Sequence, residues 1–341
     1  MLREGLQMKD NRKIRLTEIV NLYRSVLILI IISLVASIAS PAFFSIGNIF
    51  NVIRQIAMAG IVGCGMTFVI LLGGIDLSVG SIVGLAGVIA AGVLRDTGNV
   101  ALALVLALIV GILCGAVNGL IISQFSIPPF IATLGMMTLL RGCILVYTNG
   151  SPIPIKSDAY KFIGKGDLLG GIPVPILILF VVYAIAHFIL SNTRFGRYIY
   201  ALGGSREASR LSGINVQKIE WMVYIISGIL SAITGVILTA RLGSAQSTNG
   251  EGIEMDAIAA VILGGTSMSG GTGFVLPTVI GAMIMGIIDN ILTLMNVNPH
   301  ATKIVKGAVI LAAVLIDRKL KDVSVKTVVM EEATTDAKHN N

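Results

Sequence analysis

Residues 56–80 read IAMAGIVGCGMTFVILLGGIDLSVG. Residues 56–75 carry no charged side chain, and a helix needs about 20 mostly apolar residues to cross the hydrocarbon core of a bilayer. The apolar run is interrupted by Gly73 and Gly74, and Asp76 lies two residues after Gly74. This stretch therefore predicts a membrane-spanning helix that ends in a Gly-rich break.

The rest of the chain has a similar composition. Of its 341 residues, 55% are hydrophobic and only 13% are charged, against about 25% charged residues in a soluble domain. The 39 glycines suit helices that pack closely in lipid, because small residues let backbones approach one another. We therefore expect an all-α fold, a polytopic integral membrane helix bundle.

The apolar runs predict about ten transmembrane helices, some of them short or broken. They lie near residues 25–40, 56–73, 78–94, 100–122, 128–147, 172–190, 221–240, 255–266, 273–295 and 302–316. The eighth run is too short for a comfortable crossing, and the third and the last are also short.

Lysine and arginine in the flanks of the spans predict their orientation. The segments 1–24, 191–220 and 317–341 hold 16 of the 25 basic residues. We therefore expect all three in the cytoplasm, and two cytoplasmic termini require an even number of spans. The net charge of +7 follows this distribution, so it indicates membrane orientation rather than nucleic-acid binding. The expected organisation is a basic cytoplasmic segment 1–24, a transmembrane domain 25–318 and a cytoplasmic polar tail 319–341.

A cleaved signal peptide is the alternative for the first run, because Ser37-Ile38-Ala39 resembles a signal-peptidase site. The polar segment before this run is long for a signal peptide, so we expect the run to remain as a span. Cleavage would leave the orientation of the later loops unchanged.

Two Gly-rich segments resemble each other. Residues 72–80 read LGGIDLSVG and residues 263–271 read LGGTSMSGG, with five of nine positions identical. Paired Gly interruptions in two halves of a chain are typical of transporters whose broken helices line a central path. The alternative is a likeness of composition alone. A ten-span count gives both segments the same orientation, and a re-entrant 255–266 would invert one of them. The sequence does not decide between these arrangements.

Polar residues and glycines inside the spans are candidates for a translocation path or a hinge, since ionisable groups in a membrane usually face protein or water. The candidates are Gly73, Gly74, Asp76, Ser78, Asn118, Thr133, Arg141, Asn149, Gly264, Gly265 and Asn290. Hydrogen bonds between helices explain the polar members equally well. For Asp76, capping within the break is as good an explanation as substrate contact.

The loop 191–220 is the most informative hydrophilic stretch. Ser205 can cap a short helix and Gly213 can end it. Within that helix Arg206 and Arg210 are four residues apart and share a face, so a soluble partner could dock there. An ordinary positively charged cytoplasmic loop would explain the arginines but not the capped helix.

The sequence lacks the motifs of an ATPase or another enzyme. It contains no G-x-x-x-x-G-K-[ST] phosphate loop, no pairing of a nucleophile with a base, and no metal motif. We therefore expect a transport subunit without a cofactor of its own, and any ATP must be bound by another chain.

Several segments together resemble the permease subunits of bacterial ABC importers for ribose and related sugars. They are GGIDLSVGS (73–81), FIATLGM (130–136), Arg141-Gly142, YTNG (147–150), the stretch from Arg197-Tyr198 to GINV (213–216), and DAIAAVILGGT (256–266). The resemblance runs in order from about residue 25 to residue 318, and within the family it is closest to ribose permeases.

This resemblance implies a set of partners and a location. The partners are a cytoplasmic ABC ATPase, an extracytoplasmic sugar-binding protein and a second permease copy, in the lipid of the bacterial inner membrane and without nucleic acid. It also implies that the 191–220 loop couples to the ATPase. The matching residues are Arg206, Glu207, Ala208, Ser209, Arg210, Leu211 and Gly213.

Other classes of membrane protein remain alternatives. A secondary transporter driven by an ion gradient would need coupling carboxylates, for which Asp76 and Asp289 are thin support. A membrane-embedded enzyme would need a catalytic constellation. A channel would show a steady conductance.

Overall fold

The computed structural model describes residues 25–168, 171–298, 300–312 and 314–315. The expected cytoplasmic segments 1–24 and 317–341 lie outside the described residues, so their predicted locations stay predictions. The described chain is a helical membrane bundle, as the sequence predicts, with only two pairs of very short strands.

In the described part of the chain, seven helices are long and apolar enough to cross a membrane. They are α2 (Ile46–Leu71), α3 (Val79–Thr97), α4 (Val100–Phe125), α5 (Pro129–Thr148), α7 (Val174–Asn192), α10 (Val216–Leu242) and α12 (Leu276–Leu294). A shorter apolar helix, Ser25–Ala39, precedes them. Residues 300–312 are helical too, in a separate unit that begins at Asn298.

Four short helices complete the described part: α6 (Asp158–Lys165), α8 (Arg194–Gly204), α9 (Arg206–Leu211) and α11 (Ile253–Leu263). Strand β1 (Ile153–Pro154) pairs antiparallel with β4 (Ser244–Ala245), and β2 (Asp167–Leu168) pairs antiparallel with β3 (Ile172–Pro173). Both pairs lie in connections between helices, and the β1–β4 pair joins segments far apart in the sequence.

Each predicted span coincides with a helix, but the count of ten crossings is not confirmed. With 11 residues, α11 is about 16 Å long, and the hydrocarbon core is about 30 Å thick. Helix α2 starts ten residues earlier than the predicted span at residue 56, because Ser45 caps it by accepting a hydrogen bond from the N–H of Asn48.

Glycines bring α10 close to its neighbours. A Cβ atom on Gly111 of α4 would meet the backbone of Gly228 in α10. A Cβ atom on Gly87 of α3 would lie 3.0 Å from the carbonyl oxygen of Gly235, also in α10. Since only glycine allows these approaches, the small residues of α3, α4 and α10 determine how tightly the helices pack.

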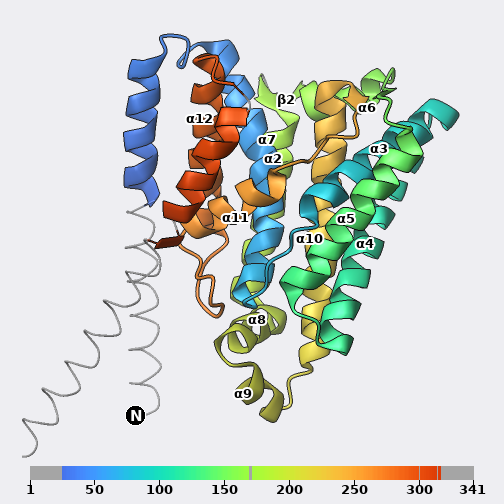
Figure 1. Ribbon diagram of the computed structural model, residues 1–341, viewed down its shortest axis with the longest axis vertical. Helices are drawn as coiled ribbons and strands as arrows, with labels where there is room; N and C mark the ends of the chain where they lie inside the picture. The colour runs from blue at the N-terminus through green and yellow to red at the C-terminus, as the bar shows by residue number, and fades with distance from the viewer. Residues whose placement is uncertain (1–24, 169–170, 299, 313, 316–341) are drawn as a thin grey trace, which may run out of the picture. The chain divides into compact units, whose positions relative to one another are not determined.

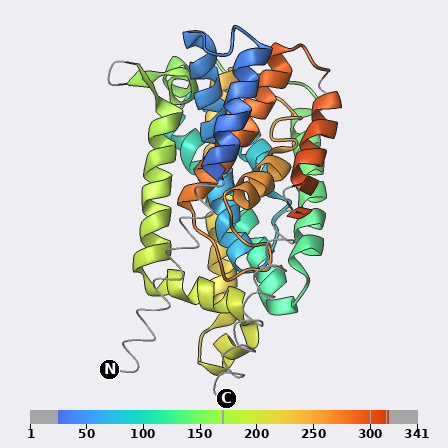
Figure 2. The ribbon, with the colours of Figure 1, turned by 90° about the vertical axis from the view of Figure 1, so that its left-hand side faces the viewer.

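The short helices lie at opposite ends of the spanning helices. Figure 1 shows α8 and α9 at the lower end and α6 with β2 at the upper end. In Figure 2, α8 runs across the lower end of the long helix α7. The loop predicted to be cytoplasmic therefore forms two helices that project from one end of the bundle.

Candidate functional site

The first Gly-rich break, residues 72–78 between α2 and α3, is held by the side chain of Asp76. This residue is fully buried. One carboxylate oxygen accepts hydrogen bonds from the N–H and the hydroxyl of Ser78 at 3.0 and 2.6 Å, and the other accepts from the hydroxyl of Ser227 in α10 at 2.8 Å. Asp76 thus fixes the turn into α3 and ties that turn to α10.

Two neighbouring helices extend this hydrogen-bond network. The side-chain amide of Asn118 in α4 donates to the Ser78 hydroxyl at 2.8 Å. The hydroxyl of Thr133 in α5 accepts from the N–H of Leu77 at 3.1 Å. The structure therefore brings four candidate path residues together around the break: Ser78 bonds to both Asp76 and Asn118, and Thr133 bonds to the backbone of the break.

The second Gly-rich break, residues 264–275 between α11 and α12, touches the first. The N–H of Gly271 donates a hydrogen bond to the carbonyl oxygen of Leu71, the last residue of α2, at 2.9 Å. A Cβ atom on Gly73 would lie 3.6 Å from the carbonyl oxygen of Ser269. Gly73 and Gly265 have φ angles of +79° and +89°, which favour glycine. The two similar segments of the sequence thus form one junction.

Helix α8 packs directly on this junction. A Cβ atom on Gly203 would collide with the carbonyl oxygen of Leu71 and the N–H of Gly271, so only glycine fits. The hydroxyl of Tyr200 donates to the carbonyl oxygen of Gly273 at 2.9 Å. A movement of α8 would therefore act on both breaks together.

Helix α9 follows α8 and is capped as the sequence predicts. The Ser205 hydroxyl accepts from the N–H of Ala208 at 3.2 Å, and Gly213, with a φ angle of +80°, follows the last turn. Leu211, the last residue of the helix, is 79% exposed. The helix thus presents an apolar side chain at the end of the molecule.

The charged residues of α9 have different partners. Arg206 forms a two-pronged ion pair with Glu220 of α10, which is only 8% exposed. Arg210 pairs with Glu207 at 3.0 Å on the surface, where both side chains are about two-thirds exposed. Ser209, between them in the sequence, is buried. Arg206 therefore attaches α9 to the bundle and Arg210 faces outward, so the two arginines have separate roles.

Arg141 of α5 binds backbone in the segment between α10 and α11. Its guanidinium donates to the carbonyl oxygens of Asn249 and Ser247 at 2.8 and 3.3 Å. In the same segment, the backbone of Gly250 packs against Gly80 in the first turn of α3. The N-terminal ends of α3 and α11 therefore meet inside the bundle, as the ends of broken helices do in transporters.

The remaining candidates occupy structural positions. Asn149 ends α5 in the left-handed conformation with a φ angle of +49°. Asn290 of α12 exchanges two amide hydrogen bonds with Asn48 of α2, at 2.7 and 2.9 Å. Gly264 packs against the backbone of Pro277 at the start of α12, and Gly74 lies against the hydroxyl of Tyr224.

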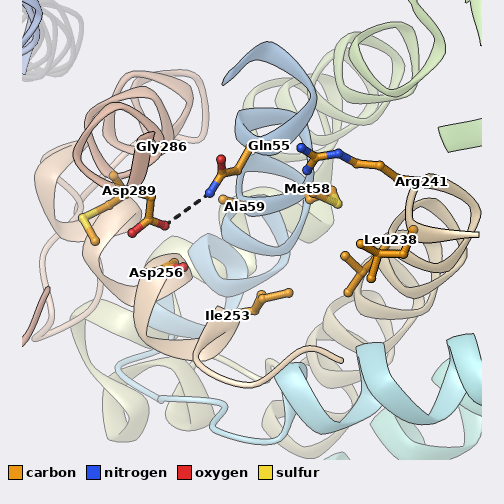
Figure 3. A pocket seen from close by; sticks show the side chains of 11 residues that line it. Gln55, Met58, Ala59, Leu238, Arg241, Ile253, Asp256, Gly286 and Asp289 are labelled. Carbon is orange, nitrogen blue, oxygen red and sulfur yellow. Dashed lines mark hydrogen bonds between the residues drawn. The ribbon is translucent and has the colours of Figure 1, made fainter. Parts of the chain in front are cut away.

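A cavity of about 400 Å³ lies among α2, α10, α11 and α12. Its polar lining comes from Gln55, Arg241, Asp256 and Asp289, one residue from each helix (Figure 3). The side-chain amide of Gln55 donates to Asp289 at 3.5 Å. These residues lie in the halves of their helices remote from α8 and α9, so the cavity opens on the opposite side of the bundle from the junction.

Sequence reasoning did not assemble this cavity. Asp256 begins the DAIAAVILGGT segment and Asp289 is a charged residue inside an apolar run, but no local pattern distinguishes Gln55 or Arg241. The one sequence feature that indicates these residues is the presence of polar side chains near the ends of apolar runs. Because the four residues are as much as 234 positions apart, only the packing of the helices shows that they share a cavity.

Comparisons with known proteins identify relatives over most of the chain. The family model described as branched-chain amino acid transport system / permease component matches residues 48–314. The ribose import permease protein RbsC of Haemophilus influenzae is 48% identical over 301 residues, which cover 87% of this chain and 93% of the relative.

Two relatives from Escherichia coli K12 are more distant. The probable ABC transporter permease protein YphD is 38% identical over 289 residues, covering 84% of this chain and 86% of the relative. The xylose transport system permease protein XylH is 35% identical, with coverage of 82% and 87%. No solved structure matches significantly. The chain therefore belongs to the family of transport-system permease components that this family model describes.

Proposed function

We propose that this chain is the membrane-spanning permease subunit of an ATP-driven ABC importer that translocates ribose. One observation carries the transport mechanism. A capped helix, α9, exposes Leu211, and the adjoining helix α8 contacts through Gly203 both the last residue of α2, Leu71, and the second Gly-rich break at Gly271. A partner that moves α8 and α9 would therefore act directly on the points where the spanning helices are interrupted.

The substrate is inferred from the relatives. The description of the family names branched-chain amino acids, but the relatives with the higher identities, 46–48% over at least 85% of this chain, are named as ribose import permeases. The relative named for xylose, another pentose, is 35% identical. A neutral sugar can be bound by hydroxyl and amide side chains. The permease therefore needs no charged side chain to compensate a charge on its substrate.

The proposed mechanism is alternating access. ATP binding and hydrolysis on a cytoplasmic ATPase change the position of α9, and α8 transmits that change to the two breaks. ATP can shift the permease between two states only if the ATPase contacts them differently. Gly73 and Gly265 are the proposed hinges. Both have positive φ angles, a backbone conformation that glycine adopts readily and residues with a Cβ atom rarely adopt.

The proposed assembly contains an ABC ATPase at α9, an extracytoplasmic sugar-binding protein at the opposite end, and a second permease copy. Both termini and the 191–220 loop are cytoplasmic in this proposal, because these segments hold most of the basic residues. The permease itself carries no cofactor, and ATP is bound by the partner. The proposed location is the inner membrane of a bacterium.

Reconstitution tests this function. Proteoliposomes containing the chain, its ATPase and its binding protein should take up ribose only with ATP, and omission of any one component should abolish uptake. Uptake without the ATPase, driven by a proton or sodium gradient, would instead identify a secondary transporter. Uptake of leucine but not of ribose would reject the proposed substrate class.

A further inference from the structure

The corner where α7 meets α8 carries a basic surface. Arg194 and Arg197 lie in the first turn of α8, and both are exposed. Residues 174–204, which span α7 and α8, contain no aspartate or glutamate. Within the described part of the chain, no carboxylate pairs with either arginine. The two charges at this α7–α8 corner are therefore available to an anion from outside the chain.

The same corner adjoins a lipid-facing helix surface. Only 28% of the apolar window of α7 is buried inside the protein, so the remainder faces the hydrocarbon of the bilayer. Ile185 and Phe188, near the end of this helix, are 55% and 58% exposed. Arg194 begins α8 six residues after Phe188. A lipid whose acyl chain lies along α7 would therefore have its headgroup beside the arginines.

The turn between the two helices fixes the arginines at this level. The Thr193 hydroxyl donates to the carbonyl oxygen of Ile189 at 2.6 Å and accepts from the N–H of Gly196 at 3.2 Å. A Cβ atom on Gly196 would collide with the carbonyl oxygen of Leu190. Figure 2 shows α7 at one edge of the bundle and α8 crossing below its end. The first turn of α8 is thus held against the last turn of α7.

The side chains of the α7–α8 corner suit the phosphate of an anionic phospholipid. A guanidinium presents its N–H donors in a planar fork that matches phosphate oxygens. Arg194 and Arg197 are three residues apart, so they are neighbours on one face of the helix. Tyr198, beside Arg197, is 38% exposed, and tyrosine is enriched at the level of the headgroups. Charge and depth therefore point to the same kind of ligand.

We propose that the α7–α8 corner binds the headgroup of an anionic phospholipid of the cytoplasmic leaflet through Arg194 and Arg197. Its consequence for transport rests on the proposed import function. Toward its other end, α8 packs on Leu71 and Gly271 through Gly203. A headgroup bound at the first turn would hold α8 at the membrane surface and keep this contact in place. Transport should therefore depend on the anionic lipid content of the membrane.

Native mass spectrometry of the purified chain tests the binding step without the ATPase. Phosphatidylglycerol and phosphatidylcholine are the probes, in separate titrations. Arg194→Gln/Arg197→Gln should weaken phosphatidylglycerol binding about 25-fold, because each basic side chain near an anionic surface contributes about fivefold in affinity. Its binding of phosphatidylcholine should not change. Arg194→Lys/Arg197→Lys, which keeps both charges, should retain most of the preference for the anionic lipid.

The charge control is Lys156→Gln/Lys218→Gln, which removes the same two charges at exposed positions outside the α7–α8 corner. Its affinity for phosphatidylglycerol should match the wild type. Equal weakening in this control would show a general effect of net charge. Wild-type affinity in Arg194→Gln/Arg197→Gln would show that the corner holds no lipid. Either result would overturn the proposal.

Uptake by the reconstituted importer tests the consequence for transport. Vesicles of phosphatidylcholine alone are compared with vesicles of equal parts phosphatidylcholine and phosphatidylglycerol. The anionic lipid should raise ribose uptake by the wild type and by the lysine control several-fold, and should have little effect on Arg194→Gln/Arg197→Gln. An equal loss of uptake by this variant in both kinds of vesicle would assign the arginines to the ATPase and overturn the proposal.

The two tests separate the possible failures. Absence of ATP-dependent ribose uptake by the wild-type importer in either kind of vesicle would reject the proposed function, and mass spectrometry would still decide the lipid site. Normal uptake that is the same in both kinds of vesicle, without preferential binding of phosphatidylglycerol, would reject the lipid site alone and leave the importer intact.

Discussion

The N–H of Gly271 donates a hydrogen bond to the carbonyl oxygen of Leu71 at 2.9 Å, which ties the second Gly-rich break to the end of the helix that precedes the first. Gly203 of α8 packs against these same two backbone groups. Three segments that are far apart in the sequence thus meet at one point. Helix α8, the end of α2 and the second break are therefore in direct contact.

The buried carboxylate of Asp76 should be necessary for stability. Asp76→Ala would leave the N–H of Ser78 and the hydroxyl of Ser227 without their acceptor. Unsatisfied buried donors cost about 1–3 kcal/mol each, so we expect a loss of about 2 kcal/mol or more. Asp76→Asn, which keeps one carbonyl oxygen, should lose less. Thermal unfolding in detergent measures both.

Asp96→Asn is the control for Asp76, because Asp96 is an exposed residue of α3 that pairs with its neighbour Arg95. Its unfolding temperature should stay at the wild-type value. If Asp76→Ala were as stable as the wild type but inactive in uptake, Asp76 would act on the substrate and not on the architecture of the break.

The ion pair between Arg206 and Glu220 should hold α9 on the bundle. Arg206→Gln leaves the carboxylate of Glu220 largely buried without its charge partner. Since the arginine itself is half exposed, we expect a loss of about 1–2 kcal/mol. The double variant Arg206→Gln/Glu220→Gln should recover part of it. A double-mutant cycle from unfolding in detergent measures the coupling between the two residues.

Arg210→Gln provides the comparison for Arg206. Its ion pair with Glu207 is exposed, so stability should change by less than about 0.5 kcal/mol. Equal destabilisation by Arg206→Gln and Arg210→Gln would show that the pairing of Arg206 with α10 does not anchor α9.

The outward face of α9 should contact the ATPase. Arg210→Glu reverses a charge on this face, and Leu211→Asp removes its exposed apolar side chain. Both variants should fold normally, but uptake should fall at least tenfold relative to ATP hydrolysis. The measurement is the ratio of ribose transported to ATP hydrolysed. Unchanged uptake in both variants would reject docking at α9.

Local sequence signals predicted much of the fold. Bilayer thickness sets the length of an apolar span, so long runs such as 100–122 appear as helices such as α4. Capping is also local, and Ser205 and Gly213 bound α9 as expected. The sequence also indicated two similar Gly-rich breaks, and the structure joins them.

Long-range contacts explain what the sequence did not predict. Residues 46–55 of α2 include the polar side chains Asn48 and Gln55, whose partners Asn290 and Asp289 lie on α12, far away in the sequence. The sequence predicts one short helix in the loop 191–220, and the structure has two, α8 and α9. Helix α8 packs through Gly203 on segments far away in the sequence, and hydrophobic periodicity does not indicate such contacts. The cavity is likewise formed by residues far apart in the sequence, so the sequence did not predict it.

The most direct test of coupling through the junction compares Gly203→Ala with Gly204→Ala. A Cβ atom on Gly203 collides with the backbone of Leu71, directly before the first break, and of Gly271 in the second break, but a Cβ atom on Gly204 meets nothing within 4 Å. The measurement is ATP-dependent ribose uptake per ATP hydrolysed, in proteoliposomes with all partners. Gly203→Ala should reduce this ratio at least tenfold with ATP hydrolysis retained, because a forced backbone shift disturbs the junction, and Gly204→Ala should match the wild type. Equal, wild-type ratios in both variants would contradict the account.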